Sequence, residues 1–149
     1  MTPDTIVIGI GNELRRDDGV GLTVAQRIAE RNLPDVRVVN GISEPAALLD
    51  VWSGVPRVVV VDAVSGPGAA PGRIRRWAGP DLESTAVVSS HALGLAQAFA
   101  LAQALARTPD ELVVFTVDVA DTNHGIGITP AVAAAVPRLV DLIVAELTR

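Results

Sequence analysis

The stretch GIGNELRRDDGVG, residues 9–21, is the most informative part of this 149-residue chain. It continues an apolar run over residues 5–10, which predicts a buried strand, and it leads into an amphipathic run over residues 18–31, which predicts a helix. A glycine-rich turn between a strand and a helix usually binds phosphate. Here the turn ends in Asp17 and Asp18, and two carboxylates would repel a phosphate. The turn therefore predicts a site for a cation or for a hydrogen-bond donor.

The composition limits the class of protein. A chain of this length suits one α/β domain, so we expect residues 1–149 to form a single domain. The net charge of −5 argues against nucleic acid or an anionic membrane as a partner. All basic residues are Arg and Cys is absent, which excludes a Schiff-base lysine, a thiol nucleophile and Cys-ligated zinc. No signal peptide or membrane span is predicted, so we expect a cytoplasmic protein.

Strand-like and helix-like segments alternate along the chain. The apolar patterns predict strands over residues 5–10, 36–40, 57–63, 86–89 and 111–118, and an edge or antiparallel strand over 73–77. They predict helices over residues 18–31, 45–52 and 90–106 and a last helix after Pro130, with Ser90 and Thr129 as caps. Pro137 should kink or split the last helix near Ala133. This alternation predicts a mostly parallel sheet with helices on both faces.

In such folds the functional site lies beyond the carboxyl ends of the strands, here residues 12–18, 62–66, 89–91 and 120–127. Asp62 follows an unbroken valine run, so it is either a site residue or the start of an exposed loop. His91 is either a ligand or a structural histidine. Asp17 and Asp18 both suit a helix cap, but a cap needs only one carboxylate, so the other is left to face the cleft.

Three of these side chains form a chemically consistent set. Asp18, Asp62 and His91 would offer two carboxylate oxygens and one imidazole nitrogen, which suit a divalent transition metal with room for outside ligands. His124 is interpreted as a solvated loop residue. The arginine pairs at 15–16 and 75–76 are interpreted as surface charge, although the first pair borders the cleft.

Other familiar sites lack the residues that they need. Ser90 beside His91 has no G-x-S-x-G turn, and no H-E-x-x-H is present. Leu14 occupies the third glycine position of a dinucleotide-binding turn, and no P-loop lysine exists. We therefore expect no tightly bound organic cofactor.

Taken together, the motifs resemble those of the nickel–iron (NiFe) hydrogenase maturation endopeptidases. These enzymes remove a short C-terminal extension from the hydrogenase large-subunit precursor once nickel is in place. The resemblance is carried by GIGNELRRDDGVG (9–21), VVVDA (59–63), SSHALG (89–94) and GITPA (127–131). It implies a single-domain, three-layer α/β/α sandwich with a twisted, mostly parallel five-stranded sheet.

The resemblance also implies the roles of the site residues. Asp18, Asp62 and His91 would contact nickel that the substrate supplies, and the large-subunit precursor would be the protein partner. Asp18 stands where the family often has Glu. Hydrolysis would use Asp18 or Asp62 as a general base for water, or the metal to polarise the carbonyl. Two alternatives remain: a non-catalytic metal-binding or maturation chaperone of the same fold, and a metal-dependent peptidase that acts on other proteins.

Overall fold

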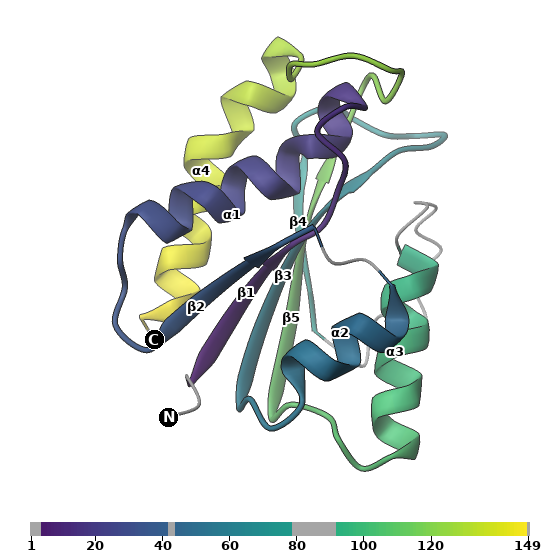
Figure 1. Cartoon of the computed structure of the whole chain (residues 1–149). Coiled ribbons are helices and arrows are strands. Elements are labelled where there is room, and N and C mark those ends of the chain that lie inside the picture. Colours follow the sequence, from purple (N-terminus) through teal and green to yellow (C-terminus); the bar gives the residue numbers. More distant parts are fainter. Residues whose placement is uncertain (1–3, 42–43, 79–91, 149) are drawn as a thin grey trace.

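One sheet with the strand order β2-β1-β3-β5-β4 forms the centre of the molecule (Figure 1). The computed structural model describes residues 4–41, 44–78 and 92–148. Strands β1, β2, β3 and β5 pair in parallel, and β4 pairs antiparallel with β5 at one edge. The strands are β1 Thr5–Gly9, β2 Val36–Asn40, β3 Arg57–Val64, β4 Ile74–Ala78 and β5 Glu111–Asp118. The predicted mostly parallel sheet is confirmed, and so is the edge strand.

Helices cover both faces of the sheet. Helices α1 and α4 lie on one face, and α2 and α3 lie on the other (Figure 1). A short 3-10 turn, η1, precedes α1. The bounds are η1 Arg16–Gly19, α1 Val20–Glu30, α2 Pro45–Trp52, α3 Ala92–Ala104 and α4 Pro130–Leu147. The described residues therefore form the predicted three-layer α/β/α sandwich.

The valine run of β3 is buried on both faces. Val58 and Val60 pack in the core beneath α2 and α3, whereas Val59 and Val61 pack in the core beneath α1 and α4. Because successive side chains of a strand point to opposite faces, a strand covered on both sides has no solvated positions. This burial explains why the run shows no alternation of apolar and polar residues.

The boundaries of some strands and helices differ from the sequence predictions. Strand β1 ends at Gly9, one residue early, and η1 occupies the predicted first turn of α1. Helix α4 runs through Pro137 as one element, so a split helix is wrong. Pro137 is exposed, and the opposite, apolar stripe of α4 packs on the sheet and holds the helix together despite the missing hydrogen bond. The predicted strand at 86–89 and the Ser90 cap lie outside the described residues.

Candidate functional site

Two predicted site residues lie at the carboxyl ends of neighbouring strands. Asp18 is in η1, just after β1, and Asp62 is near the end of β3; they are 5% and 2% exposed. Turn η1 contacts β3, and the Ile10 N–H donates to the Val61 carbonyl oxygen at 3.0 Å. The chain that leads to Asp18 is therefore fixed to the strand that carries Asp62.

Backbone N–H groups orient both carboxylates. The Asn12 N–H donates to Oδ2 of Asp18 at 2.9 Å. The Ala63 N–H donates to Oδ1 of Asp62 at 2.8 Å. Each of these hydrogen bonds holds one oxygen of its carboxyl group in place. The two side chains thus present buried, oriented oxygens, the arrangement that a cation or a water molecule about to be deprotonated requires.

Glycines of the 9–21 motif allow this close packing. A Cβ atom on Gly11 would overlap the carbonyl oxygen of Asp18, and Gly11 has a φ of 147°. A Cβ atom on Gly21 would overlap the carbonyl oxygens of Ile10 and Val61. The motif therefore brings the start of α1 directly onto the ends of β1 and β3.

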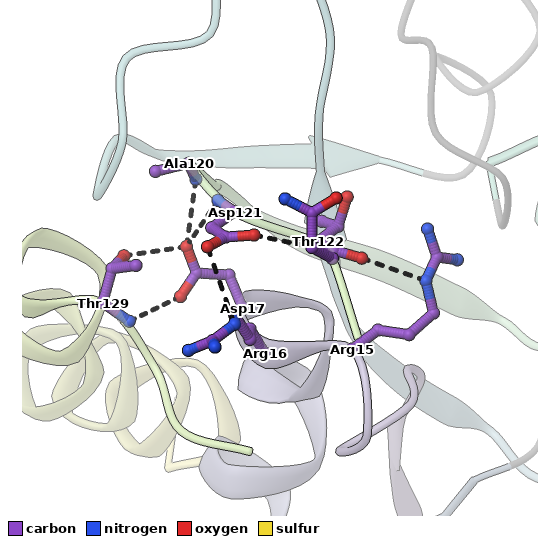
Figure 2. Close-up of polar contacts among 8 residues, drawn as sticks. Arg15, Arg16, Asp17, Ala120, Asp121, Thr122 and Thr129 are labelled. Atoms are coloured by element: carbon purple, nitrogen blue, oxygen red, sulfur yellow. Dashed lines mark hydrogen bonds and ion pairs between the residues drawn. The ribbon is translucent and has the colours of Figure 1, made fainter. Parts of the chain in front are cut away.

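Asp17 has a different role from Asp18, although the two are adjacent. Its side chain is 0% exposed and accepts four hydrogen bonds from a loop more than 100 residues later in the chain (Figure 2). The donors are the N–H groups of Ala120 and Asp121, both at 3.0 Å, and the N–H and hydroxyl groups of Thr129, at 2.7 and 2.8 Å. We call this set of contacts the Asp17 clamp.

Hydrogen bonding determines the charge of Asp17. Burial alone would raise the pKa of Asp17, because it disfavours the charged form. The hydrogen bonds from Thr129, Asp121 and Ala120 outweigh burial and hold the pKa of Asp17 below its ordinary value of 3.8. The side chain is therefore a carboxylate at neutral pH.

The predicted aspartate cap of α1 is wrong, whereas Thr129 lies at the predicted N-cap position of α4. Neither Asp17 nor Asp18 caps α1, whose N-cap is Gly19, with no side-chain capping bond. Thr129 is at the N-cap position of α4, but its hydroxyl group donates to Asp17 and makes no capping bond. The distant loop offers Asp17 several donors at once, so the tertiary contact prevails over the local one.

Further contacts hold the loop at 120–127 against η1. The Gly125 N–H donates to the Leu14 carbonyl oxygen at 2.8 Å, and the Arg16 N–H donates to the Gly125 carbonyl oxygen at 3.0 Å. Arg15 donates through Nε to the Thr122 carbonyl oxygen, as Figure 2 shows. Two of the four predicted strand-end segments, residues 12–18 and 120–127, are thus joined by direct hydrogen bonds.

The two histidines are placed differently. His91 lies outside the described residues, so its part in the predicted set stays a prediction. His124 is exposed in the loop, as expected. Within residues 4–41, 44–78 and 92–148, no group of three or more His, Cys, Asp or Glu side chains could hold a metal ion. Two members of the predicted set are therefore described, and they lie at the same edge of the sheet.

Sequence reasoning missed a charged cluster at the end of β5. Asp118 is 1% exposed. Its Oδ2 atom lies 2.9 Å from Nη2 of Arg73 and 3.4 Å from Nη2 of Arg75. Arg76 pairs with the buried Glu146 of α4. The interpretation of residues 75–76 as surface charge is confirmed only in part, because both side chains are partly exposed but each also meets a buried carboxylate. The only available signal was an aspartate that ends a strongly apolar strand.

No helix among the described residues is both long enough and apolar enough to cross a membrane.

Comparison with known proteins gives a consistent result. The family model for hydrogenase maturation proteases matches residues 22–146. The hydrogenase 2 maturation protease of Escherichia coli K12 is 26% identical over 146 residues, which cover 95% of this chain and 89% of that protein. The hydrogenase expression/formation protein HupD of Rhodobacter capsulatus is 29% identical over 150 residues, which cover 97% of this chain and 69% of that protein.

A solved structure extends this likeness to the fold. The hydrogenase maturating endopeptidase HybD of Escherichia coli superposes with a TM-score of 0.87 at 26% identity. The superposition covers 97% of this chain and 91% of HybD.

Proposed function

This chain belongs to the hydrogenase maturation protease family, and from that premise we propose that it removes the C-terminal extension of a NiFe-hydrogenase large-subunit precursor after nickel insertion. The nickel is part of the substrate in this proposal. The chain would recognise it through Asp18 and Asp62, with His91 as the third ligand.

The observation that carries the proposal is the pair of buried carboxylates at the ends of β1 and β3. Their oxygens are oriented by backbone donors, and the turn that carries Asp18 packs on the strand that carries Asp62. Carboxylate oxygens bind divalent transition metals, and an imidazole nitrogen would complete a mixed ligand set. Nickel that is already bound to the precursor could complete its coordination here.

Peptide hydrolysis needs a group that accepts a proton from the attacking water. Asp18 and Asp62 are the candidates for this general base, because both lie at the proposed contact point with the substrate. The chain has no Cys or Lys and no G-x-S-x-G turn, so water is the attacking group in this proposal. Binding of the metal and cleavage of the peptide would therefore share one edge of the sheet.

We expect Asp62→Asn to abolish processing without unfolding the chain. Asparagine keeps the size and an oxygen of Asp62 but cannot take up a proton, and loss of a general base typically slows a reaction by about 100-fold or more. Nickel-loaded and nickel-free precursor are incubated with each variant, and the products are weighed by mass spectrometry. The wild type should remove a C-terminal peptide from the nickel-loaded precursor only, and Asp62→Asn should leave both precursors uncut.

Asp110→Asn is the matched control, because Asp110 is exposed just before β5, at the opposite end of the sheet. It should cut at the wild-type rate. Equal cutting of nickel-free precursor would refute nickel recognition. A stable complex with unchanged masses would refute the endopeptidase and favour the chaperone.

A further inference from the structure

Arg75 lies on the same face of the sheet as Asp62. Thr116 of β5 pairs in register with Asp62 of β3 on one side and with Arg75 of β4 on the other. Residues paired in register point to the same face, here the face covered by α2 and α3, where Trp77 donates to Thr116 at 3.1 Å. The backbones at Asp62 and Arg75 are two strand spacings apart, a distance of about 10 Å between their Cα atoms.

The guanidinium group of Arg75 forms a single, long hydrogen bond with the described residues. Its one hydrogen bond among the described residues runs from Nη2 to Oδ2 of Asp118, at the long distance of 3.4 Å. The same Oδ2 atom already accepts the Ala70 N–H at 3.0 Å and the Arg73 guanidinium at 2.9 Å. Arg75 therefore keeps most of its N–H donors available, with 34% of its side chain exposed.

The charges of this cluster do not cancel. Asp118 and Arg73 neutralise each other, so the positive charge of Arg75 is left over. The side chain is 34% exposed, so solvent screens its charge less than that of a fully exposed arginine. A partly covered arginine with unused donors is suited to a carboxylate, which it binds through two parallel hydrogen bonds.

We propose that Arg75 binds a carboxylate group of the precursor, about three residues from the bond that is cut. The spacing follows because an extended peptide spans about 10 Å with three residues, the separation of Asp62 and Arg75. The carboxylate is an acidic side chain of the C-terminal extension or, where the extension is only about three residues long, its terminal α-carboxylate. This inference rests on the proposed function, and it makes Arg75 a specificity-determining residue.

The test is the steady-state kinetics of Arg75→Gln on nickel-loaded precursor. Loss of a charge-assisted hydrogen bond should raise KM about 10-fold or more, while kcat changes less than about twofold. Arg75→Glu should raise KM further by repulsion. Arg138→Gln is the control, because it removes the same charge from an exposed position on α4 and should leave KM unchanged.

Two altered precursors identify the source of the carboxylate. One carries amides in place of the acidic side chains of the extension, and the other has three glycines appended, which move the α-carboxylate. One of the two altered precursors should have a higher KM than the unaltered precursor when the wild type cuts it, but the same KM as the unaltered precursor when Arg75→Gln cuts it. That altered precursor has lost the group that Arg75 binds. If KM of Arg75→Gln stays within about twofold of wild type, or if only kcat falls, the proposal is wrong.

Binding separates this inference from the proposed function. Titration calorimetry of the precursor with Asp62→Asn, alone and combined with Arg75→Gln, measures recognition without cleavage. A Kd raised about 10-fold by Arg75→Gln supports the carboxylate contact even if the wild type cuts nothing, an outcome that would refute only the peptidase. An unchanged Kd would overturn the inference even if cleavage is normal.

Discussion

At the residue scale, Asp17 and Asp18 show that two identical neighbours can have different tasks. Asp17 is enclosed by donors from the loop at 120–129. Asp18 accepts a hydrogen bond from the Asn12 N–H and lies beside β3 at the carboxyl ends of the strands. Since Asp17 fixes η1 to the loop, it also fixes the backbone from which Asp18 projects.

We expect Asp17→Asn to lower the free energy of unfolding by about 2–4 kcal/mol at pH 7. The substitution removes the charge and places an NH₂ group against N–H donors. Because the pKa of Asp17 is lowered, its stabilising effect is present above pH 3.8 and is lost as the pH falls below that value, through the folded-state pKa.

Urea unfolding of both proteins at a series of pH values measures this effect. The difference between wild type and Asp17→Asn should shrink as the pH falls below 3.8. Asp50→Asn, on the exposed side of α2, should change stability by less than about 0.5 kcal/mol. A difference that is independent of pH would contradict the assignment of the lowered pKa to Asp17.

At the scale of elements, the approach of α1 to the sheet positions the site. Gly21 lies against the carbonyl oxygens of Ile10 and Val61, so the helix begins in direct contact with the ends of β1 and β3. A side chain at this position would push α1 outward and would shift η1, which carries Asp18. Helix packing and site geometry are therefore coupled through one small residue.

Gly21→Ala should destabilise the fold even though alanine favours helices. The added methyl group meets backbone atoms, which cannot rotate away, and overpacking of this kind costs about 1–3 kcal/mol. Thermal unfolding followed by circular dichroism measures the loss. Gln26→Ala, exposed on the same helix, should be neutral or slightly stabilising. Equal melting temperatures for Gly21→Ala and wild type would contradict the close approach.

At the scale of the whole molecule, one sheet separates two apolar cores. Strand β3 contributes valines to both cores, and β5 contributes Leu112 and Val114 to one and Val113 and Phe115 to the other. Loss of either helical layer would expose one complete face of the sheet. The two layers should therefore unfold together.

We expect a single cooperative transition in urea. Trp77→Phe leaves Trp52, buried beneath α2 and α3, as the one fluorescent tryptophan. Its fluorescence reports the core on that face, whereas far-ultraviolet circular dichroism reports all helices. Coincident midpoints are expected. A tryptophan transition that precedes the loss of helix would show that the α2–α3 layer unfolds on its own.

The mostly parallel sheet, its helical layers and the two aspartates at adjacent strand ends could all be predicted from the amino-acid sequence. These features follow from local periodicity and from the rule that sites in such folds lie at the carboxyl ends of strands. The predicted roles of Asp18 and Asp62 stay predictions, although the structure places both at the predicted edge.

The identity of the clamp carboxylate, and of the arginine that keeps unused donors, depends on contacts between segments that are distant in the chain. Asp17 finds its donors more than 100 residues away, and Arg75 meets Asp118 across an antiparallel pair. Local patterns contain no record of such pairings, because a hydrogen bond between distant segments depends on where the folded backbone places each donor. For the same reason the Thr129 hydroxyl group donates to Asp17, and neither α1 nor α4 has a side-chain capping bond.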